Sequence, residues 1–249
     1  MFKLRPIFWP TAIMLPVIVF ALGLGVWQIE RREWKRDILD RIATNQAAAP
    51  LTFDELVKGD PLRREYGRVR VSGSFLHDKE FYLAARSLRD KVGLQVVTPL
   101  RLGDGTIILF DRGWIPSEKK DPARRAEGQL PGNVELTGIV RRSQVKRQFA
   151  PDNDPPRNFW FHVDVPLMRQ MAGGKPDPAL DSFFLEADAT ANPGGVPIGG
   201  QTRLDIPNDH LQYAITWFLI ALAGLAVYLA YHWENGRLAV NGRTKVKRA

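Results

Sequence analysis

Two long uncharged segments, one near each end of the chain, constrain the fold more than any other feature of the sequence. Residues 6–29 and 211–231 contain no charged side chain over 24 and 21 positions. An apolar helix of about 20 residues spans the hydrocarbon core of a bilayer. A cleaved signal peptide is the alternative for the first segment, but its apolar part would be shorter and would end at small residues. The sequence therefore predicts transmembrane helices at residues 6–29 and 210–231, with a 180-residue domain, residues 30–209, between them.

The distribution of charge indicates which side of the membrane each part occupies. The end segments, residues 1–5 and 232–249, together hold seven basic residues and one acidic residue. Basic residues also follow the first span closely, so a local count barely discriminates, but long domains are translocated regardless of their charge. We therefore expect both tails in the cytoplasm and the domain outside it. Basic charge that is confined to tails beside anionic lipid does not indicate a nucleic-acid partner.

The central region alternates apolar and polar residues with a period of two, which is typical of strands. Strands are expected at residues 68–75, 80–85, 94–102, 106–110, 134–140, 158–163 and 183–187. A Gly-Asp-Gly turn at residues 103–105 predicts a hairpin, and Pro99 indicates an edge or a bulge in its first arm.

Helical segments are fewer in this region. We expect residues 30–42 to continue the first helix, and short helices at residues 52–58, opened by a Thr52–Glu55 capping box, and 166–171. The predicted fold class is an α+β membrane protein. Two transmembrane helices flank a mostly antiparallel β domain, which is a small barrel or sandwich with a few short helices.

His210 stands out among the four histidines because it opens the second span. Asp209 followed by Gln212 is a capping-box pattern, so a helix is expected to begin here with His210 in its first turn. A helix N-terminus disfavours positive charge, so a neutral ring able to bind a metal is expected. One face of this helix is predicted to carry His210, Tyr213, Ala214, Trp217, Ala221 and Gly224.

The other histidines have more ordinary interpretations. His77 is expected in a surface turn, His162 in a strand with a structural role, and His232 in an interfacial belt at the far end of the second span. They share no spacing typical of a metal site. Cysteine is absent, which excludes disulfides, thiolate metal sites and covalent haem attachment.

An antiparallel pairing of the two spans would place residues 25–28 at the depth of His210, with basic residues just outside that level. These residues suit a flat apolar ring that carries anionic groups at the membrane interface. A porphyrin with outward propionates fits, and so does a quinone or a lipid headgroup. The candidate binding residues are His210, Tyr213, Trp217, Trp27, Gln28, Arg31, Arg32 and Arg203.

Three segments carry a resemblance to a known family. Gly25-Val26-Trp27-Gln28, followed by Arg31-Arg32 and Trp34-Lys35, resembles the first-span signature of the surfeit locus protein one family. Residues 97–100 and 111–116 resemble its central motif, and residues 208–217 its second-span signature. The matches come in the order of the family and span nearly the whole chain. Phe110 and Asp111 stand where the family pattern has an apolar residue and Asn.

The resemblance implies an assembly factor for haem-copper terminal (cytochrome c) oxidase in the bacterial inner membrane, and not an enzyme. Bacterial members of the family bind haem a through the second-span histidine. Carried over by position, this makes His210 the axial ligand of the haem iron, with Trp27 and Trp217 beside it. The domain would lie in the periplasm, between haem a synthase and oxidase subunit I.

Two alternatives stay open at this stage. The chain could be a cofactor-free scaffold that stabilises an assembly intermediate of subunit I. It could also be a quinone- or lipid-binding enzyme, although the usual nucleotide and hydrolase motifs are missing. For Arg112, Gly113 and Trp114, a structural role is favoured over a functional one.

Overall fold

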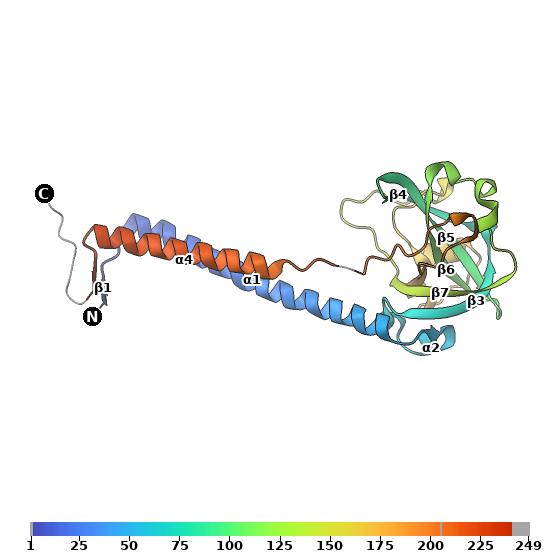
Figure 1. Ribbon diagram of the computed structural model, residues 1–249, viewed down its shortest axis with the longest axis horizontal. Coiled ribbons are helices and arrows are strands. Elements are labelled where there is room, and N and C mark those ends of the chain that lie inside the picture. Colours follow the sequence, from blue (N-terminus) through green and yellow to red (C-terminus); the bar gives the residue numbers. More distant parts are fainter. Residues whose placement is uncertain (1, 205, 241–249) are drawn as a thin grey trace. The chain divides into compact units, whose positions relative to one another are not determined.

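The computed structural model in Figure 1 describes residues 2–204 and 206–240. The chain divides into two compact units. One comprises Met1–Asp40 with Ile206–Ala249, and the other comprises Arg41–Asp205. The first boundary lies inside a long helix, about ten residues beyond the predicted end of the first span at residue 29. The last residues of the predicted basic tail, 241–249, lie outside the described part of the chain.

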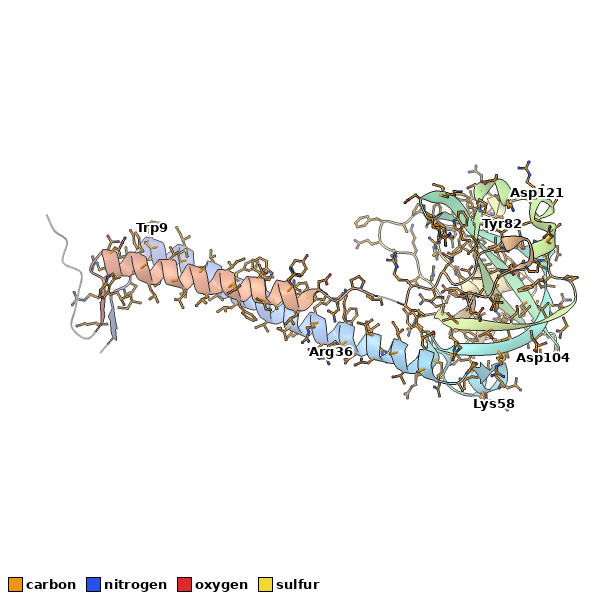
Figure 2. All side chains as sticks on the ribbon, in the orientation of Figure 1. Trp9, Arg36, Lys58, Tyr82, Asp104 and Asp121 are labelled. Atoms are coloured by element: carbon orange, nitrogen blue, oxygen red, sulfur yellow. The ribbon has the colours of Figure 1, made fainter. Side chains whose placement is uncertain are left out.

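Two long helices dominate the first unit. Helix α1 (Phe8–Ala47) includes the predicted first span and its charged continuation in one 40-residue helix. Helix α4 (His210–Glu234) begins at the predicted residue. Both are long and apolar enough to cross a membrane. Their large apolar side chains project outward, as Figure 2 shows for Trp9, which is 72% exposed. Such exposure suits a lipid environment.

The start of α4 differs in one detail from the prediction. Asp209 occupies the N-cap position, but its side chain makes no capping hydrogen bond. Its backbone carbonyl instead accepts from the N–H groups of Gln212 and Tyr213 at 3.1 and 3.4 Å. The predicted capping box of α4 is therefore wrong, whereas the Thr52–Glu55 box that opens helix α2 (Phe53–Lys58) is confirmed.

The second unit contains a closed five-stranded barrel, so the predicted fold class is confirmed. The hydrogen-bonded order is β3-β7-β8-β6-β5, and β5 pairs again with β3. Strand β4 extends the sheet beyond β5, and β2 pairs with β3 in parallel. The strands are β2 (Leu51–Thr52), β3 (Arg68–Phe75), β4 (Phe81–Leu88), β5 (Lys91–Leu102), β6 (Ile107–Pro116), β7 (Asn133–Arg142) and β8 (Phe183–Ala187).

Short helices connect the strands. Helix α3 (Val165–Met171) confirms the predicted helix at residues 166–171. The 3₁₀ helices are η1 (Pro61–Arg64), η2 (His77–Lys79), η3 (Ser117–Lys119), η4 (Pro122–Gly128), η5 (Pro155–Arg157), η6 (Leu180–Ser182) and η7 (Pro193–Gly195).

The predicted strand at residues 158–163 is wrong. This segment is irregular, with an isolated bridge between Trp160 and Leu83 of β4. Its aromatic residues do not extend the sheet. Trp160 instead packs, fully buried, in a cluster with Val97 and Leu109. Alternating aromatic residues therefore indicated burial correctly but not the backbone conformation.

Pro99 lies where β5 changes its partner. Residues 91–97 of β5 pair with β4, whereas residues 100–102 pair with β3. A proline has no N–H to donate, so it is tolerated at this change of partner. The β5–β6 ladder also contains a register shift between Val96 and Val97, opposite Arg112. The bulge predicted from Pro99 therefore lies two residues away and on the facing strand.

Both faces of the central strands are buried. Leu100, Phe110 and Leu185 point into the barrel core. Their neighbours in sequence, such as Leu109 and Phe184, pack outside the barrel against Trp160 and helix α3. Because side chains alternate along a strand and both faces are buried, β6 begins with a continuous apolar run, residues 107–110. The barrel therefore gives the second unit a rigid core.

The two ends of the chain pair with each other, which the sequence did not predict. Strands β1 (Phe2–Leu4) and β9 (Leu238–Val240) form an antiparallel ladder. The backbone N–H of Arg5 donates to the carbonyl of Arg237 at 2.8 Å. This ladder lies beyond the N-terminus of α1 and the C-terminus of α4, so it ties those two ends together.

Candidate functional site

Helices α1 and α4 lie side by side and antiparallel (Figure 1). Thr11 and Tyr228 share a hydrogen bond of 2.8 Å near one end, and Gln28 and His210 share one of 2.6 Å near the other. The buried or half-buried series of α1 is Thr11, Met14, Ile18, Ala21, Gly25, Gln28 and Arg32, and that of α4 is His210, Ala214, Trp217, Ala221, Gly224 and Tyr228. Alternating steps of three and four residues are the pattern of a coiled coil.

Small residues bring the two helices into close contact. Ala21, Ala214 and Ala221 are almost completely buried. A Cβ added to Gly25 would lie 2.6 Å from the ring of Phe218. Side chains therefore fill the contact between the helices at this depth. The predicted binding site between the two helices stays a prediction.

The hydrogen bond between His210 and Gln28 determines the state of the imidazole. Nδ1 of His210 lies 2.6 Å from Oε1 of Gln28, which can only accept. Nδ1 is therefore the donor in this pair, and Nε2 is the ring nitrogen that the bond leaves free. A metal-ligating histidine usually donates its second ring nitrogen to an oxygen in this way, because the bond orients the ring. Gln28 thus orients the His210 ring.

The backbone just before α4 keeps this pair in register. The ammonium of Lys35 donates to the carbonyl of Pro207 at 2.6 Å, and the amide of Asn208 donates to the carbonyl of Arg32 at 3.3 Å. Both bonds tie the segment that enters α4 to the continuation of α1. These contacts, just before His210, help to hold it against Gln28.

Helix geometry places the predicted aromatic residues on one flank of the pair. Trp27 lies to one side of Gln28 on α1, and Tyr213 lies to the same side of His210 because the helices run in opposite directions. Trp27 and Tyr213 are 51% and 57% exposed, whereas Trp217, two turns along α4 from His210, is half-buried. Gly25 and the ring of Phe218, which packs against it, lie on the opposite flank. The flank with Trp27 and Tyr213 is therefore the one that presents two strongly exposed rings beside His210.

The predicted basic residues have different surroundings. Arg31 stacks on the ring of Trp34, with 3.8 Å from the guanidinium carbon to the ring centroid. Arg32 forms an exposed ion pair with Glu33 at 3.0 Å. Arg203 belongs to the other unit, where it lines a cavity beside the barrel. Arg31 and Arg32 belong to α1 and lie one turn of that helix beyond Gln28.

His232 holds the opposite end of the helix pair together. It is completely buried. Its Nε2 accepts from the backbone N–H of Ile7 at 3.0 Å, and its Nδ1 lies 2.8 Å from the carbonyl of Tyr228. The ring thus satisfies an N–H group at the start of α1 that has no partner within the helix. The interfacial position of His232 suggested an exposed anchor, but its contacts are structural.

A buried charge network lies in the barrel unit, and sequence reasoning missed it. Glu80 is 4% exposed and binds the guanidinium of Arg125 through both carboxylate oxygens. It also accepts from the hydroxyl groups of Tyr82 at 3.0 Å and Thr98 at 3.4 Å. Burial alone would raise the pKa of Glu80, but its side-chain interactions with His77, Arg125 and Tyr82 and the charge of Arg125 lower it to about 2. The carboxylate is therefore ionised at neutral pH.

His77 belongs to the edge of this network. It lies in the turn η2, as expected, but its ring is partly buried. Nε2 lies 3.0 Å from the carbonyl of Leu130, and Nδ1 lies 3.5 Å from Oε1 of Glu80. His162 contacts the amide of Asn153 at 3.2 Å in the irregular segment. Both histidines have structural contacts.

Arg112 and Gly113 hold the barrel to the chain segment that leads toward α4. Arg112 is 1% exposed, stacks on Phe75, and donates to the carbonyl of Gly128. Gly113 has a φ of +112°, and an added Cβ would lie 2.0 Å from the carbonyl oxygen of Ile198. Only glycine fits there.

Trp114 follows on the same strand, and its backbone exchanges two hydrogen bonds with Ile198, at 2.9 and 2.8 Å. Together with the contacts of Arg112 and Gly113, this supports the structural interpretation of the motif.

Asp111 begins this motif as a buried acid. It lies beside Glu186 where β6 and β8 pair in parallel. Burial and the charge of Glu186 raise the pKa of Asp111 to about 8. Its Oδ1 accepts from the N–H of Gly113 at 2.9 Å. A buried pair of carboxyl groups holds a proton at neutral pH, because two adjacent negative charges would repel each other.

Comparison with known proteins decides the family. Residues 15–222 match the model of the SURF1 family. This chain belongs to the SURF1 family. Surfeit locus protein 1 of Homo sapiens is 35% identical over 240 residues, which covers 89% of this chain and 75% of that protein.

Two further SURF1 relatives are covered nearly to their full length. The protein of the same name from Takifugu rubripes is 34% identical over 237 residues, or 89% of this chain and 93% of that protein. A SURF1-like protein of Monosiga brevicollis is 36% identical over 244 residues, with 92% and 89% covered. The similarity therefore includes both long helices and the barrel.

The family match places His210, Gln28 and the Glu80 network in the region shared with other SURF1 proteins. Across residues 2–204 and 206–240, His, Asp and Glu side chains form no group of three that could hold a metal ion. His210 can supply a single ligand.

Proposed function

We propose that this SURF1-family chain is an assembly factor for haem-copper terminal (cytochrome c) oxidase that holds haem a at His210 and assists its insertion into subunit I. The observation that carries the proposal is the hydrogen bond from Nδ1 of His210 to Oε1 of Gln28. It leaves Nε2 as the coordinating nitrogen and fixes the plane of the ring.

The flank beside His210 fits the apolar body of a porphyrin. Trp27 and Tyr213 present exposed rings there, and Trp217 presents a half-buried one. Bound haem a would supply the iron and its redox chemistry, while the chain supplies an axial nitrogen and an apolar wall. Arg31 and Arg32, one turn further along α1, suit the propionates.

An open flank also suits transfer to another protein. A carrier must release its load, and a site with one strong protein ligand and one open side allows a partner to approach. The proposed partners are haem a synthase as the donor and subunit I as the acceptor. Side chains occupy the contact between the helices, which favours haem binding on the surface of the helix pair. An acceptor protein in the same bilayer could reach the haem there.

The proposed location follows from the two spans. We place the chain in the bacterial inner membrane, with both tails in the cytoplasm and the barrel unit in the periplasm. The chain would act as a chaperone without catalysing a reaction. Nucleic acid is not among its proposed partners.

The test is the absorption spectrum of the full chain, purified in detergent from cells that make haem a. Wild-type protein is expected to carry a Soret band. His210→Ala should lose most of the bound haem, and Gln28→Leu should shift the spectrum or weaken binding, because the imidazole loses its orienting bond. His210→Gly with added imidazole should regain the band.

A matched control separates ligation from general damage. His162→Ala removes a histidine of the barrel unit that has a partner of its own, and it should keep the full Soret band. If His210→Ala binds haem with an unchanged spectrum, the ligand assignment is wrong.

A cofactor-free scaffold is the second candidate. The filled contact between α1 and α4 favours it, because side chains such as Phe218 occupy the space between the helices. The barrel would then steady an assembly intermediate of subunit I through its surface. Co-purification of subunit I with wild-type and His210→Ala protein alike, without pigment in either, would support the scaffold over the haem carrier.

A further inference from the structure

A basic cavity of about 700 Å³ lies beside the barrel, on the second unit. Its size is within the range of small-molecule sites. The charged side chains on its wall are Arg86, Arg141, Arg142, Arg147, Arg203, Glu65 and Glu186. Five of these seven side chains are basic. The cavity is therefore strongly positive.

Several of these cations lack a full set of partners. Nε of Arg141 is buried without a hydrogen bond, and Glu186 is 3.6 Å away. Nδ1 of His162, on the same wall, is also buried without a partner. In the described part of the chain, Arg147 and Arg203 have no carboxylate within salt-bridge distance. Guanidinium groups arranged in this way match the oxygens of a phosphate or carboxylate.

An exposed apolar loop forms the rim of this cavity. Val145 and Phe149 are 84% and 97% exposed, and Lys146 and Arg147 lie between them. The base of the loop is fixed, because Gln144 exchanges hydrogen bonds of 2.9 and 3.2 Å with the backbone of Val163. The side chains of Val145 and Phe149 therefore project from a loop whose base is held by hydrogen bonds.

We propose that this cavity and its rim form a second membrane contact, in which the cavity binds the headgroup of an anionic phospholipid. Val145 and Phe149 enter the acyl layer while Arg147 and Arg203 pair with the phosphate. Basic side chains beside exposed apolar ones are the composition of interfacial membrane contacts. Because helices α1 and α4 anchor the chain, the barrel unit stays within reach of a bilayer. The proposal does not depend on haem binding.

The absence of cysteine allows a specific probe in the full chain. A nitroxide is attached to Gln148→Cys, which leaves Phe149 intact, and the protein is placed in nanodiscs. Discs of phosphatidylcholine alone are compared with discs that also contain phosphatidylglycerol. The ratio of oxygen to aqueous nickel accessibility should rise severalfold in the anionic discs. A label on Lys58→Cys, exposed on α2 (Figure 2), should stay aqueous in both.

Charge variants decide which residues bind the headgroup. Arg147→Gln with Arg203→Gln should return the label to its aqueous value, whereas Arg101→Gln with Lys91→Gln, exposed and outside the cavity, should not. Equal accessibility of the label in both kinds of disc would overturn the proposal. So would equal loss in both double variants, since binding would then depend on net charge alone.

A soluble ligand gives a different result. If inorganic phosphate raises the unfolding temperature of the protein in phosphatidylcholine discs while the label stays aqueous, the cavity serves free phosphate and the lipid assignment is wrong.

Discussion

Glu80→Gln should destabilise the barrel unit strongly. The pKa of Glu80 falls from 4.5 to about 2 in the folded protein. Each pKa unit corresponds to about 1.4 kcal/mol, so the ionised carboxylate stabilises the fold by about 3 kcal/mol. The substitution also leaves Arg125 buried beside a neutral amide, and a buried charge without its partner costs about 3–5 kcal/mol. These two figures describe one interaction, so the expected loss is about 3–5 kcal/mol.

The pH dependence provides a second measurement of the same interaction. The folded pKa of Glu80 is below its unfolded value. The stabilisation is therefore fully present above pH 4.5 and is lost as the pH falls toward 2. Wild-type stability should decline through this window, and the decline in Glu80→Gln should be smaller. Urea unfolding of the full chain in detergent measures both effects through the fluorescence of Trp114 and Trp160, which are buried in the barrel unit.

An exposed glutamate provides the control. Glu135→Gln on β7 should change the free energy of unfolding by less than about 0.5 kcal/mol, because surface substitutions have small effects. The reasoning fails if Glu80→Gln is no more destabilising than Glu135→Gln, or if both variants keep the wild-type decline below pH 4.5.

Three further predictions concern other contacts. Asp111→Asn should raise the unfolding temperature at pH 7 but not at pH 4. The folded pKa of about 8 makes stability fall as the pH rises from about 4 to 8, and an equal change at both pH values would contradict this. Gly113→Ala should cost at least about 3 kcal/mol or prevent folding, because its Cβ would meet the carbonyl of Ile198; near-normal urea unfolding would show that the loop can move. Gly25→Val should push α1 from the ring of Phe218 and broaden the distance distribution between nitroxide labels on the two helices; an unchanged distribution would mean the ring can turn aside.

Local patterns predicted most of the elements. The strand at residues 68–75 and the strand at residues 183–187 have the expected bounds. Alternation along a strand and a glycine-rich turn are local signals, so they can be read without the tertiary structure. The segment at residues 158–163 failed because its aromatic residues pack around the outside of the barrel, where burial does not require a strand.

The candidate site was predictable only in part. The position of His210 at the start of a membrane helix and the matching depth of Gln28 follow from helix lengths. Their hydrogen bond depends on the rotation of both helices about their axes, which the pattern of apolar residues does not specify. Glu80 could have been noticed as an acid directly before an apolar strand, but no local signal pairs it with Arg125.

The sequence by itself determined the two membrane helices, the strand segments and the family, because each depends on residues that are neighbours along the chain. Only the tertiary structure decided how the sheet closes, with β8 inserted between β6 and β7 and β5 joined to β3. It also decided that Gln28 meets His210 across 182 residues. Such contacts depend on register and rotation between distant segments, so they form only when the whole chain packs. His210 therefore began as a histidine on a patterned helix face, and the structure shows it as an oriented imidazole on an aromatic flank.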